Sequence, residues 1–350
     1  MPINLWGFNQ TGLGSRDASW QPVHELVVRY GLEGHVAWSG ERTACGGVQT
    51  YTRETGDPDR YEEVMTLATP AGDLQSVYSC SRSGKPGYTV KYLVTSVEEA
   101  GRWLSLPDPD LPSVGGFHER ERQVGERALL CIAVGDWASP MQMVNEAVGS
   151  ELWAYWLHDE RELLHEMVGK TFRRILRELQ HYLAHGVGPL YGWGGPELCL
   201  PPLASVHDFE DFVVRYDQPL IEAVHEGGGV VWVHCHGDMA PVLQHFLDMG
   251  VDCLNPIEPP PMGKLTLAEV KEHVAGQMTL EGGVESSALD LLSPAAMAEV
   301  VAETVAMGKP GGRFILGPTS SPAPWPVMLP HLYENYRVLV ETGLALGAYP

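Results

Sequence analysis

Basic side chains are scarce in this sequence. Its 350 residues include 23 Lys and Arg against 45 Asp and Glu, which gives a formal net charge of −22. Proteins that bind the phosphate backbone of nucleic acids, or anionic membrane surfaces, carry the opposite balance. The composition therefore argues against nucleic acid and membrane partners. The acidity itself indicates solubility, or a preference for a basic face on a protein partner.

Long apolar stretches and paired cysteines are also missing. No run approaches the roughly 18 apolar residues that a membrane-spanning helix needs, and the N-terminus lacks the basic and apolar regions of a signal peptide. Cysteines stand at 45, 80, 131, 199, 235 and 253 without a C-x-x-C pair. Scattered thiols are typical of a reducing compartment, so we expect a cytoplasmic protein.

The two common glycine-rich nucleotide motifs are absent as well. No G-x-G-x-x-G lies between an expected strand and helix, and no G-x-x-x-x-G-K-[ST] occurs. With 44% hydrophobic and 19% charged residues, the chain has enough apolar material for a sizeable core. Its length suits one large domain, such as a single barrel, or two smaller ones.

Residues 1–125 have an irregular pattern with frequent Gly and Pro. Residues 87–94 are rich in aromatic and β-branched side chains and predict a short strand. A turn signal at 69–72 separates two apolar runs and predicts a β-hairpin. We therefore expect a β-rich N-terminal cap over 1–125, covering one end of a main domain over 126–350.

From about residue 128, short apolar runs alternate with long amphipathic segments. The runs lie at 128–134, 188–193, 230–234, 251–255, 277–280 and 313–316. Residues 160–184 place apolar side chains every three or four positions, as a core-facing helix does. Apolar runs without polar alternation suit parallel strands buried on both faces. The α/β pattern favours a (β/α)8 TIM barrel over a Rossmann sheet, although it places only six of the strands.

The strongest chemical signal is His234-Cys235-His236-Gly237, at the end of the run over 230–234. Side chains two apart in a strand point to the same side, so His234 and His236 are expected to project together. Active sites of barrels lie at the C-terminal ends of the strands, where two imidazoles can share one metal ion. The alternative is a pair of hydrogen-bonded histidines in a polar pocket.

Acidic residues after neighbouring strands are candidates for completing such a site. Glu258 follows the next run, and the prolines at 259–261 restrict its loop. Glu197 follows the run over 188–193. Two histidines and one glutamate with an open position form a catalytic zinc environment, so the predicted metal ligands are His234, His236 and either Glu258 or Glu197. The alternative role for each glutamate is to cap a loop or face solvent.

Weaker candidates follow other strands. Asp136 is placed to orient a substrate, with a turn or helix cap as the alternative. Glu285 has a similar place, and capping is again the simpler role. Trp137, Trp193 and Trp325 are candidates for an apolar pocket that binds an aromatic substrate, although buried tryptophans usually belong to the core.

Several segments together resemble the uroporphyrinogen decarboxylase superfamily. They are 234–237, 250–258, 281–285, 311–317 and Asn335-Tyr336. The resemblance spans about residues 125–345, and it implies a (β/α)8 barrel. The superfamily contains cofactor-free decarboxylases and corrinoid-linked methyltransferases. The decarboxylases carry an arginine-rich N-terminal segment for porphyrinogen carboxylates, whereas the first 40 residues here contain only Arg16 and Arg29. The resemblance therefore favours the methyltransferase branch.

Thiol-methylating members of that branch hold zinc with His-x-Cys and a late Cys. Here His236 stands at the Cys position, and the late position falls near Thr319-Ser320. Imidazoles with a carboxylate leave zinc more Lewis-acidic than thiolates do, which suits polarising an ether oxygen. The resemblance thus implies an O-demethylase, in which zinc binds the ether oxygen of a methoxylated substrate, such as an aromatic one, while Co(I) attacks the methyl carbon. Glu258 and Asp136 are its candidate catalytic residues.

The corrinoid-binding motif D-x-H-x-x-G is absent from the sequence. We therefore expect the corrinoid (cobalamin) on a separate protein that docks at the barrel mouth, besides a small-molecule methyl donor. The sequence is also compatible with a homodimer. Two other functions also stay open: a cofactor-free decarboxylase, which predicts no metal and an arginine-lined cleft, and a non-catalytic ligand-binding barrel, which predicts no open metal position.

Overall fold

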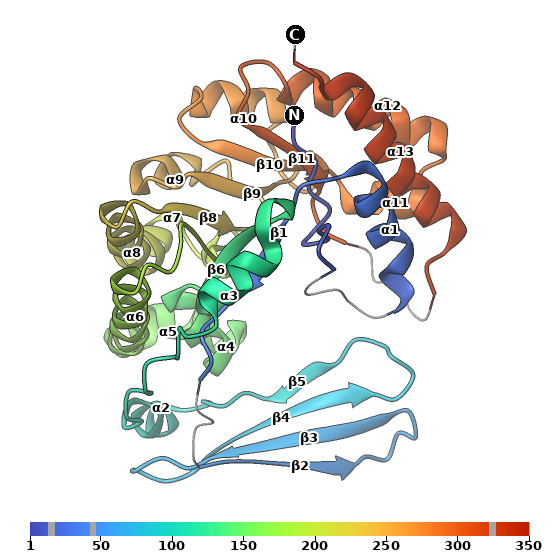
Figure 1. Cartoon of the computed structure of the whole chain (residues 1–350). Helices are drawn as coiled ribbons and strands as arrows, with labels where there is room; N and C mark the ends of the chain where they lie inside the picture. The colour runs from blue at the N-terminus through green and yellow to red at the C-terminus, as the bar shows by residue number, and fades with distance from the viewer. Residues whose placement is uncertain (13–17, 43–46, 322–326, 350) are drawn as a thin grey trace.

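The computed structural model describes residues 1–12, 18–42, 47–321 and 327–349. A seven-stranded parallel sheet, in the order β1-β6-β7-β8-β9-β10-β11, curls around a central space (Figure 1). Its strands are β1 (His35–Trp38), β6 (Leu129–Ala138), β7 (Leu190–Gly194), β8 (Val230–His234), β9 (Cys253–Ile257), β10 (Thr279–Val284) and β11 (Phe314–Pro318). The six strands predicted after residue 128 are therefore confirmed.

Helices cover the outer face of this sheet (Figure 1). They are α4 (Pro140–Val148), α5 (Ser150–Asp159), α6 (Arg161–Ala184), α7 (Val206–Phe209), α8 (Arg215–Glu226), α9 (Leu243–Met249), α10 (Leu267–Val274), α11 (Ser286–Leu291), α12 (Pro294–Gly308) and α13 (Pro330–Gly347). The helix predicted over 160–184 is confirmed as α6, and its buried stripe includes Leu164, Val168 and Leu179. None of the helices in the described ranges is long and apolar enough to cross a membrane.

The barrel prediction is confirmed only in part, because strand pairing does not close the sheet. Within the described ranges, β1 has no hydrogen-bonded partner strand other than β6, and β11 none other than β10. Ile3 instead forms a single parallel bridge with Leu316 of β11. Next to β1, a Cβ added at Gly34 would lie 2.5 Å from the Phe8 carbonyl oxygen, so the backbones touch there. The irregular segment 2–9 therefore fills the place where the predicted barrel would have another strand.

The strand β1 comes from the region predicted as the cap. It pairs in parallel with β6, from His35 opposite Leu129 to Trp38 opposite Ile132. Its four residues are too few to show a clear period, which explains why the pattern did not reveal it. The boundary at residue 125 stays a prediction, although β1 and the bridge at Ile3 lie on its N-terminal side.

The remainder of the N-terminal region contains an antiparallel sheet, β2-β3-β4-β5, which projects from one side of the curled sheet (Figure 1). Its strands are β2 (Val48–Glu54), β3 (Arg60–Leu67), β4 (Leu74–Ser81) and β5 (Tyr88–Lys91). The predicted hairpin is confirmed as β3 and β4, paired from Leu67 to Leu74. The N-terminal region also contains three helices: α1 (Gln21–Tyr30), α2 (Val97–Leu104) and α3 (Phe117–Val124). Of these, α2 lies against both β4 and α6.

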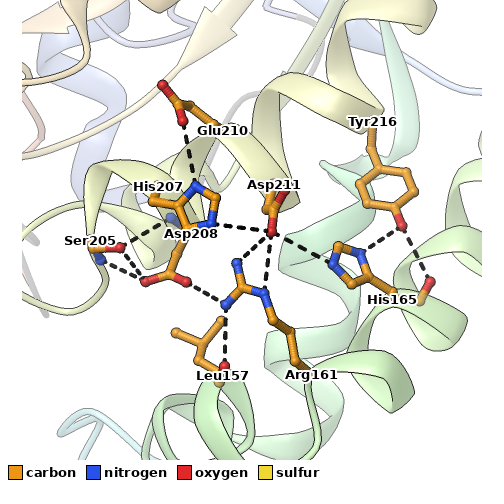
Figure 2. Close-up of polar contacts among 9 residues, drawn as sticks. All are labelled: Leu157, Arg161, His165, Ser205, His207, Asp208, Glu210, Asp211 and Tyr216. Carbon is orange, nitrogen blue, oxygen red and sulfur yellow. Dashed lines mark hydrogen bonds and ion pairs between the residues drawn. The ribbon is translucent and has the colours of Figure 1, made fainter.

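An ion-pair cluster holds the connection between β7 and β8 against α6 (Figure 2). The Arg161 guanidinium, at the start of α6, donates to Asp208 Oδ1 at 2.7 Å and to Asp211 Oδ2 at 2.6 Å. It also donates to the carbonyl of Leu157 in α5 at 3.2 Å. Asp208 is the third residue of α7, and Asp211 lies in a π-helical turn over Glu210–Val214. One guanidinium therefore joins three helical segments on the outer layer.

Candidate functional site

A chamber of about 320 Å³ lies inside the curled sheet, towards the C-terminal ends of its strands. This volume lies at the lower end of the range for small-molecule sites, roughly 300 to 1,000 Å³. The side chains that give it its character are Trp6, His35, Trp137, Trp232, His234 and Glu281. Aromatic rings therefore dominate its wall, and one carboxyl group faces it.

His234 and His236 lie together at the end of β8, as the alternation of a strand predicts. Their ring centroids are 4.6 Å apart and the rings are perpendicular. The Nδ1 of His234 lies 2.9 Å from Asn255 Oδ1, and the Nδ1 of His236 lies 3.0 Å from Glu258 Oε1. A proton on each Nδ1 makes these bonds and leaves each Nε2 lone pair free. Neither Nε2 has a hydrogen-bond partner among the residues that the structure describes.

The pKa values of the two rings shift in opposite directions because their partners differ. Burial lowers the pKa of His234 to about 4, although the hydrogen bond to Asn255 opposes this shift, so the ring is neutral at pH 7. Burial also acts to lower the pKa of His236, but the hydrogen bond and charge of Glu258 outweigh it and raise that pKa. Burial acts to raise the pKa of Glu258, but hydrogen bonds from His236 and from the Gly237 amide at 2.6 Å lower it.

Glu197 lies beside this pair, in a 3-10 turn over Pro196–Cys199 that follows β7. Its Oε2 atom is buried and has no hydrogen-bond partner in the described part of the chain. Burial raises the pKa of Glu197, while the nearby charge of His236 opposes the shift and that of Glu258 adds to it. The carboxyl group thus lies within electrostatic range of the pair, with one oxygen unused.

These residues fit a bound zinc ion in part. Within the described ranges, no three His, Cys, Asp or Glu side chains converge as a metal site requires. His234 and His236 do have the hydrogen bonds through Nδ1 that orient zinc-binding imidazoles. Both carboxylate oxygens of Glu258 accept hydrogen bonds, one from His236 Nδ1 and one from the Gly237 amide. Glu258 therefore orients the His236 ring and is not free to bind the metal. Glu197, with its unpartnered oxygen, is the better candidate for a third ligand.

Trp6 belongs to the site and was missed by the sequence analysis. Its ring lies 5.2 Å from that of His234 and stacks on that of His236 at 6.2 Å. Its Nε1 donates to the Pro318 carbonyl at 2.7 Å. Trp6 reaches the histidines because the segment 2–9 lies between the edge strands. No local pattern around residue 6 indicates such a long-range contact.

Glu281 is a second residue to which the sequence analysis gave no role. It is 5% exposed and lies on β10. Asn4 Nδ2 donates to its Oε1 at 2.6 Å, and Trp232 Nε1 donates to its Oε2 at 2.8 Å. Burial raises the pKa of this carboxyl group. The sequence analysis used the segment 281–285 only as part of the family resemblance. The signal that could have identified Glu281 is a carboxylate within an apolar, buried strand.

The predicted tryptophans occupy different places. Trp137 lines the chamber, with its ring 5.8 Å from that of Trp232, which was not predicted. Trp193 is buried in the core outside the chamber lining, where its Nε1 donates to Asp217 Oδ2 at 3.0 Å. Trp325 lies outside the described residues.

Asp136 lies apart from the histidine pair. Its side chain is 54% exposed and pairs with Arg174 at 3.1 Å and Arg42 at 3.5 Å. The backbone explains this orientation, since Gly135, Asp136 and Trp137 have φ angles of 59°, 57° and 69°. This left-handed run accompanies a shift in register between β6 and β7. It sends Trp137 into the chamber and Asp136 towards the arginines.

Glu285 caps α11, as the simpler of its two roles predicted. Its carboxylate accepts from the Ser287 amide and from Thr319 Oγ1, each at 3.3 Å. Thr319 stands near the late cysteine position of the thiol-methylating relatives, and it also accepts from the Ser286 amide at 3.0 Å. This position therefore stabilises the start of a helix.

Comparisons with known proteins place the fold. The chain matches the family model described as Uroporphyrinogen decarboxylase (URO-D) over residues 86–334. It is similar to the structure of a methyltransferase from Methanosarcina mazei, with 16% identity and a TM-score of 0.53, covering 77% of this chain and 74% of that one. A muconate lactonizing enzyme from Pseudomonas putida aligns with 10% identity and a TM-score of 0.30, over 89% and 78% of the chains. No curated protein matches the sequence.

At 16% identity, the likeness to the methyltransferase shows a shared fold. The family match is broader evidence, because it covers well over half of the chain and includes the histidine pair, Glu258 and Glu281. It also contains six of the seven parallel strands. On the strength of that match, the chain belongs to the uroporphyrinogen decarboxylase family.

Proposed function

We propose that this protein is a zinc-dependent methyltransferase that moves a methyl group from a methoxylated substrate, aromatic ones included, to the corrinoid of a separate protein. The observation that carries the proposal is the pair of imidazoles, His234 and His236, each with a free Nε2. His234 lines the aromatic chamber, and His236 lies next to it. Membership of the family and the fold shared with a methyltransferase support the reaction class.

The chamber wall suits a neutral aromatic substrate. It contains the indole rings of Trp6, Trp137 and Trp232, and among its described lining residues there is no Lys or Arg. Indole faces provide stacking surface for a substrate ring. A decarboxylase that acts on a polycarboxylate needs cationic partners for the carboxylates, and this lining lacks them. The chamber therefore favours the methyltransferase over the decarboxylase alternative.

The residues around the pair have distinct tasks in this proposal. His234 and His236 would hold zinc through Nε2, with Glu197 as the third ligand, and the ion when bound supplies a Lewis acid for the ether oxygen. Asn255 and Glu258 fix the orientation of the two rings. Trp6 covers both imidazoles and limits the access of water.

The methyl acceptor is proposed to dock at the open end of the chamber. The strands end there, and His236 is partly exposed, with 34% of its side chain accessible. A net charge of −22 predicts that the corrinoid protein presents a basic face. Docking should then weaken as salt concentration rises, because exposed charges are screened.

The test combines metal content with a transfer assay. Purified protein is analysed for zinc and then incubated with free Co(I) cobalamin and a panel of methoxylated and methylamine compounds. We expect stoichiometric zinc and methyl transfer from a methoxylated compound, both lost in His236→Ala. The exposed His158 provides a matched control, since His158→Ala should keep both.

Full activity in zinc-free protein would overturn the proposal. Decarboxylation by such protein would favour the second enzyme class. Ligand binding without any turnover would favour a non-catalytic barrel.

A further inference from the structure

The chamber adjoins a second cavity at the opposite end of the curled sheet. This lower cavity has a volume of about 650 Å³ and is lined by Leu129, Leu190 and Val230, which begin β6, β7 and β8. Four residues line both the chamber and the lower cavity: Asn4, His35, Trp232 and Glu281. This layer of four side chains therefore lies between the chamber and the lower cavity.

Glu281 is the acidic group in this layer, and burial raises its pKa. Asn4 and Trp232 do not titrate in this range, and burial lowers the pKa of His35 to about 4, so that ring is neutral. Glu281 is 5% exposed, and its hydrogen-bond donors are uncharged groups. A buried carboxyl group without a cationic partner favours its protonated form.

The hydrogen bonds around Glu281 suit that protonated form. Asn4 lies 2.6 Å from Glu281 Oε1, while the Oδ1 of the same amide is buried without a partner. Rotating the amide by half a turn, which exchanges nearly indistinguishable atoms, lets the carboxyl proton be donated to Oδ1. Trp232 Nε1 still donates to the other oxygen.

The remaining groups that face Glu281 do not compete for this proton. The Cys253 thiol lies 3.9 Å from its Oε2, and Cys131 is close enough for its charge to interact with Glu281. Burial raises the pKa of both thiols, so they stay neutral. His234 is also neutral at pH 7, and Arg313 lines only the lower cavity.

We propose that Glu281 is the acid that protonates the substrate oxygen when its methyl group leaves, and that the lower cavity recharges it. This inference rests on the proposed function. The C–O bond breaks and its electron pair stays on oxygen, while Co(I) of the corrinoid partner uses its own electron pair to bond the methyl carbon. The oxygen takes the carboxyl proton of Glu281. The products are an alcohol or phenol, methyl-Co(III) and a Glu281 carboxylate.

The lower cavity explains how the carboxylate regains its proton. A corrinoid protein docked at the chamber mouth closes that route to water during the transfer. Glu281 borders the lower cavity on its other side, and water there can return the proton. The methyl acceptor thus reaches the substrate carbon from one end of the sheet, and the proton reaches the substrate oxygen from the other end.

Glu281→Gln tests the acid, because glutamine keeps the size and the acceptor for Trp232 but has no acidic proton. The substrates are methyl aryl ethers whose phenol products differ in acidity. We expect the rate of the variant to fall by about 100-fold or more for weakly acidic phenols, the typical contribution of a general acid. It should stay near the wild-type rate for strongly acidic ones. The exposed Glu272 provides the control, and Glu272→Gln should match the wild type throughout.

A loss of the same factor for every ether would overturn the acid role, and so would an unchanged rate. If the wild-type protein transfers no methyl group, the proposed function itself fails. Infrared spectra of protein labelled with ¹³C-glutamate then still test Glu281. We expect the carbonyl band of a protonated acid at pH 7, present in Glu197→Gln and missing in Glu281→Gln. A spectrum without that band in Glu197→Gln would overturn the assignment independently of turnover and of how the variant folds.

The recharging route has its own test. Leu129 and Val230 are exposed at the rim of the lower cavity, at 64% and 43%. The double variant Leu129→Trp, Val230→Trp narrows this rim. We expect an unchanged rate for the first turnover, since Glu281 starts protonated, and a slower steady state. An unchanged steady state would overturn the route.

Discussion

His234 and His236 are two positions apart, yet their neighbours give them opposite pKa shifts. The first ring is bonded to an uncharged amide and buried, so it stays neutral. The second is bonded to a carboxylate, which favours its protonated form. A metal ion at this pair would therefore compete with a proton mainly at His236, since ligands must be deprotonated.

Replacing Glu258 tests this account in the metal-free protein. Glu258→Gln removes the negative charge but keeps an acceptor for the Gly237 amide. We expect the pKa of His236 to fall, because burial lowers it and the opposing charge of Glu258 is removed. An NMR titration of the imidazole signals measures it, with the exposed His158 as internal reference. An unchanged pKa at His236 would contradict the proposed pairing.

A second prediction concerns Asp136, which the sequence suggested as a catalytic residue. Its side chain is turned to Arg42 and Arg174, away from the chamber. Asp136→Asn keeps a residue that tolerates positive φ and removes two partly exposed ion pairs. We expect methyl transfer to stay within about twofold and the free energy of unfolding to fall by about 1 kcal/mol or less. A large loss of turnover with intact folding would restore Asp136 to the site.

Predictability at the residue scale depended on local spacing. The histidine pair was found because a strand projects positions i and i+2 to one side, and Glu258 because it follows the next strand. Trp6 and Glu281 were not found, since their roles come from contacts across the chain. Asp136 and Trp137 were both predicted at the site, but only Trp137 lines the chamber, and the three consecutive positive φ angles that separate them have no signature in the residues Asp-Trp.

At the scale of helices and strands, the parallel strands could be predicted because strands buried on both faces are short, uninterrupted apolar runs. The six strands after residue 128 are short apolar runs bounded by helical segments, and all six are confirmed. The segment 2–9 gave no such signal, because it packs between β1 and β11 with only one strand-like bridge to β11. Sequence periodicity therefore predicted the strands of the sheet but not the way in which its edges meet.

Arg161 provides a test of how the outer helices are held (Figure 2). Arg161→Met keeps an apolar stem but leaves Asp208, which is 8% exposed, without its cation. We expect the free energy of unfolding to fall by about 2–3 kcal/mol, measured by urea denaturation. Arg337→Met is the control, since the ion pairs of Arg337 within the described part of the chain are with Glu334 and Glu341 on its own helix. It should cost about 1 kcal/mol or less, and equal losses would contradict the proposed difference.

At the scale of the whole molecule, one buried carboxyl group links stability to pH. Asp217 lies in the core behind β7, and its hydrogen-bond donor among the described residues is Trp193. Burial raises its pKa to about 7. The folded protein thus keeps the group neutral where the unfolded chain ionises it, near pH 4. Its contribution to stability is complete below about pH 4 and is lost as the pH rises towards 7.

Asp217→Asn should remove this dependence. Asparagine keeps an acceptor for Trp193 and never ionises. The free energy of unfolding of the variant, relative to that of the wild type, should therefore rise by up to about 4 kcal/mol between pH 4 and pH 8. Denaturant unfolding of both proteins at several pH values measures the difference. A gap of constant size at every pH would show that Asp217 is not the group responsible.

The bridge between Ile3 and Leu316 also sets an order of events during synthesis on the ribosome. Trp6 emerges early, but its partner carbonyl at Pro318 is translated some 310 residues later. The segment 2–9 therefore lacks its contacts with β11 until β11 leaves the exit tunnel. The candidate site, to which Trp6 belongs, is consequently among the last parts of the protein to be completed.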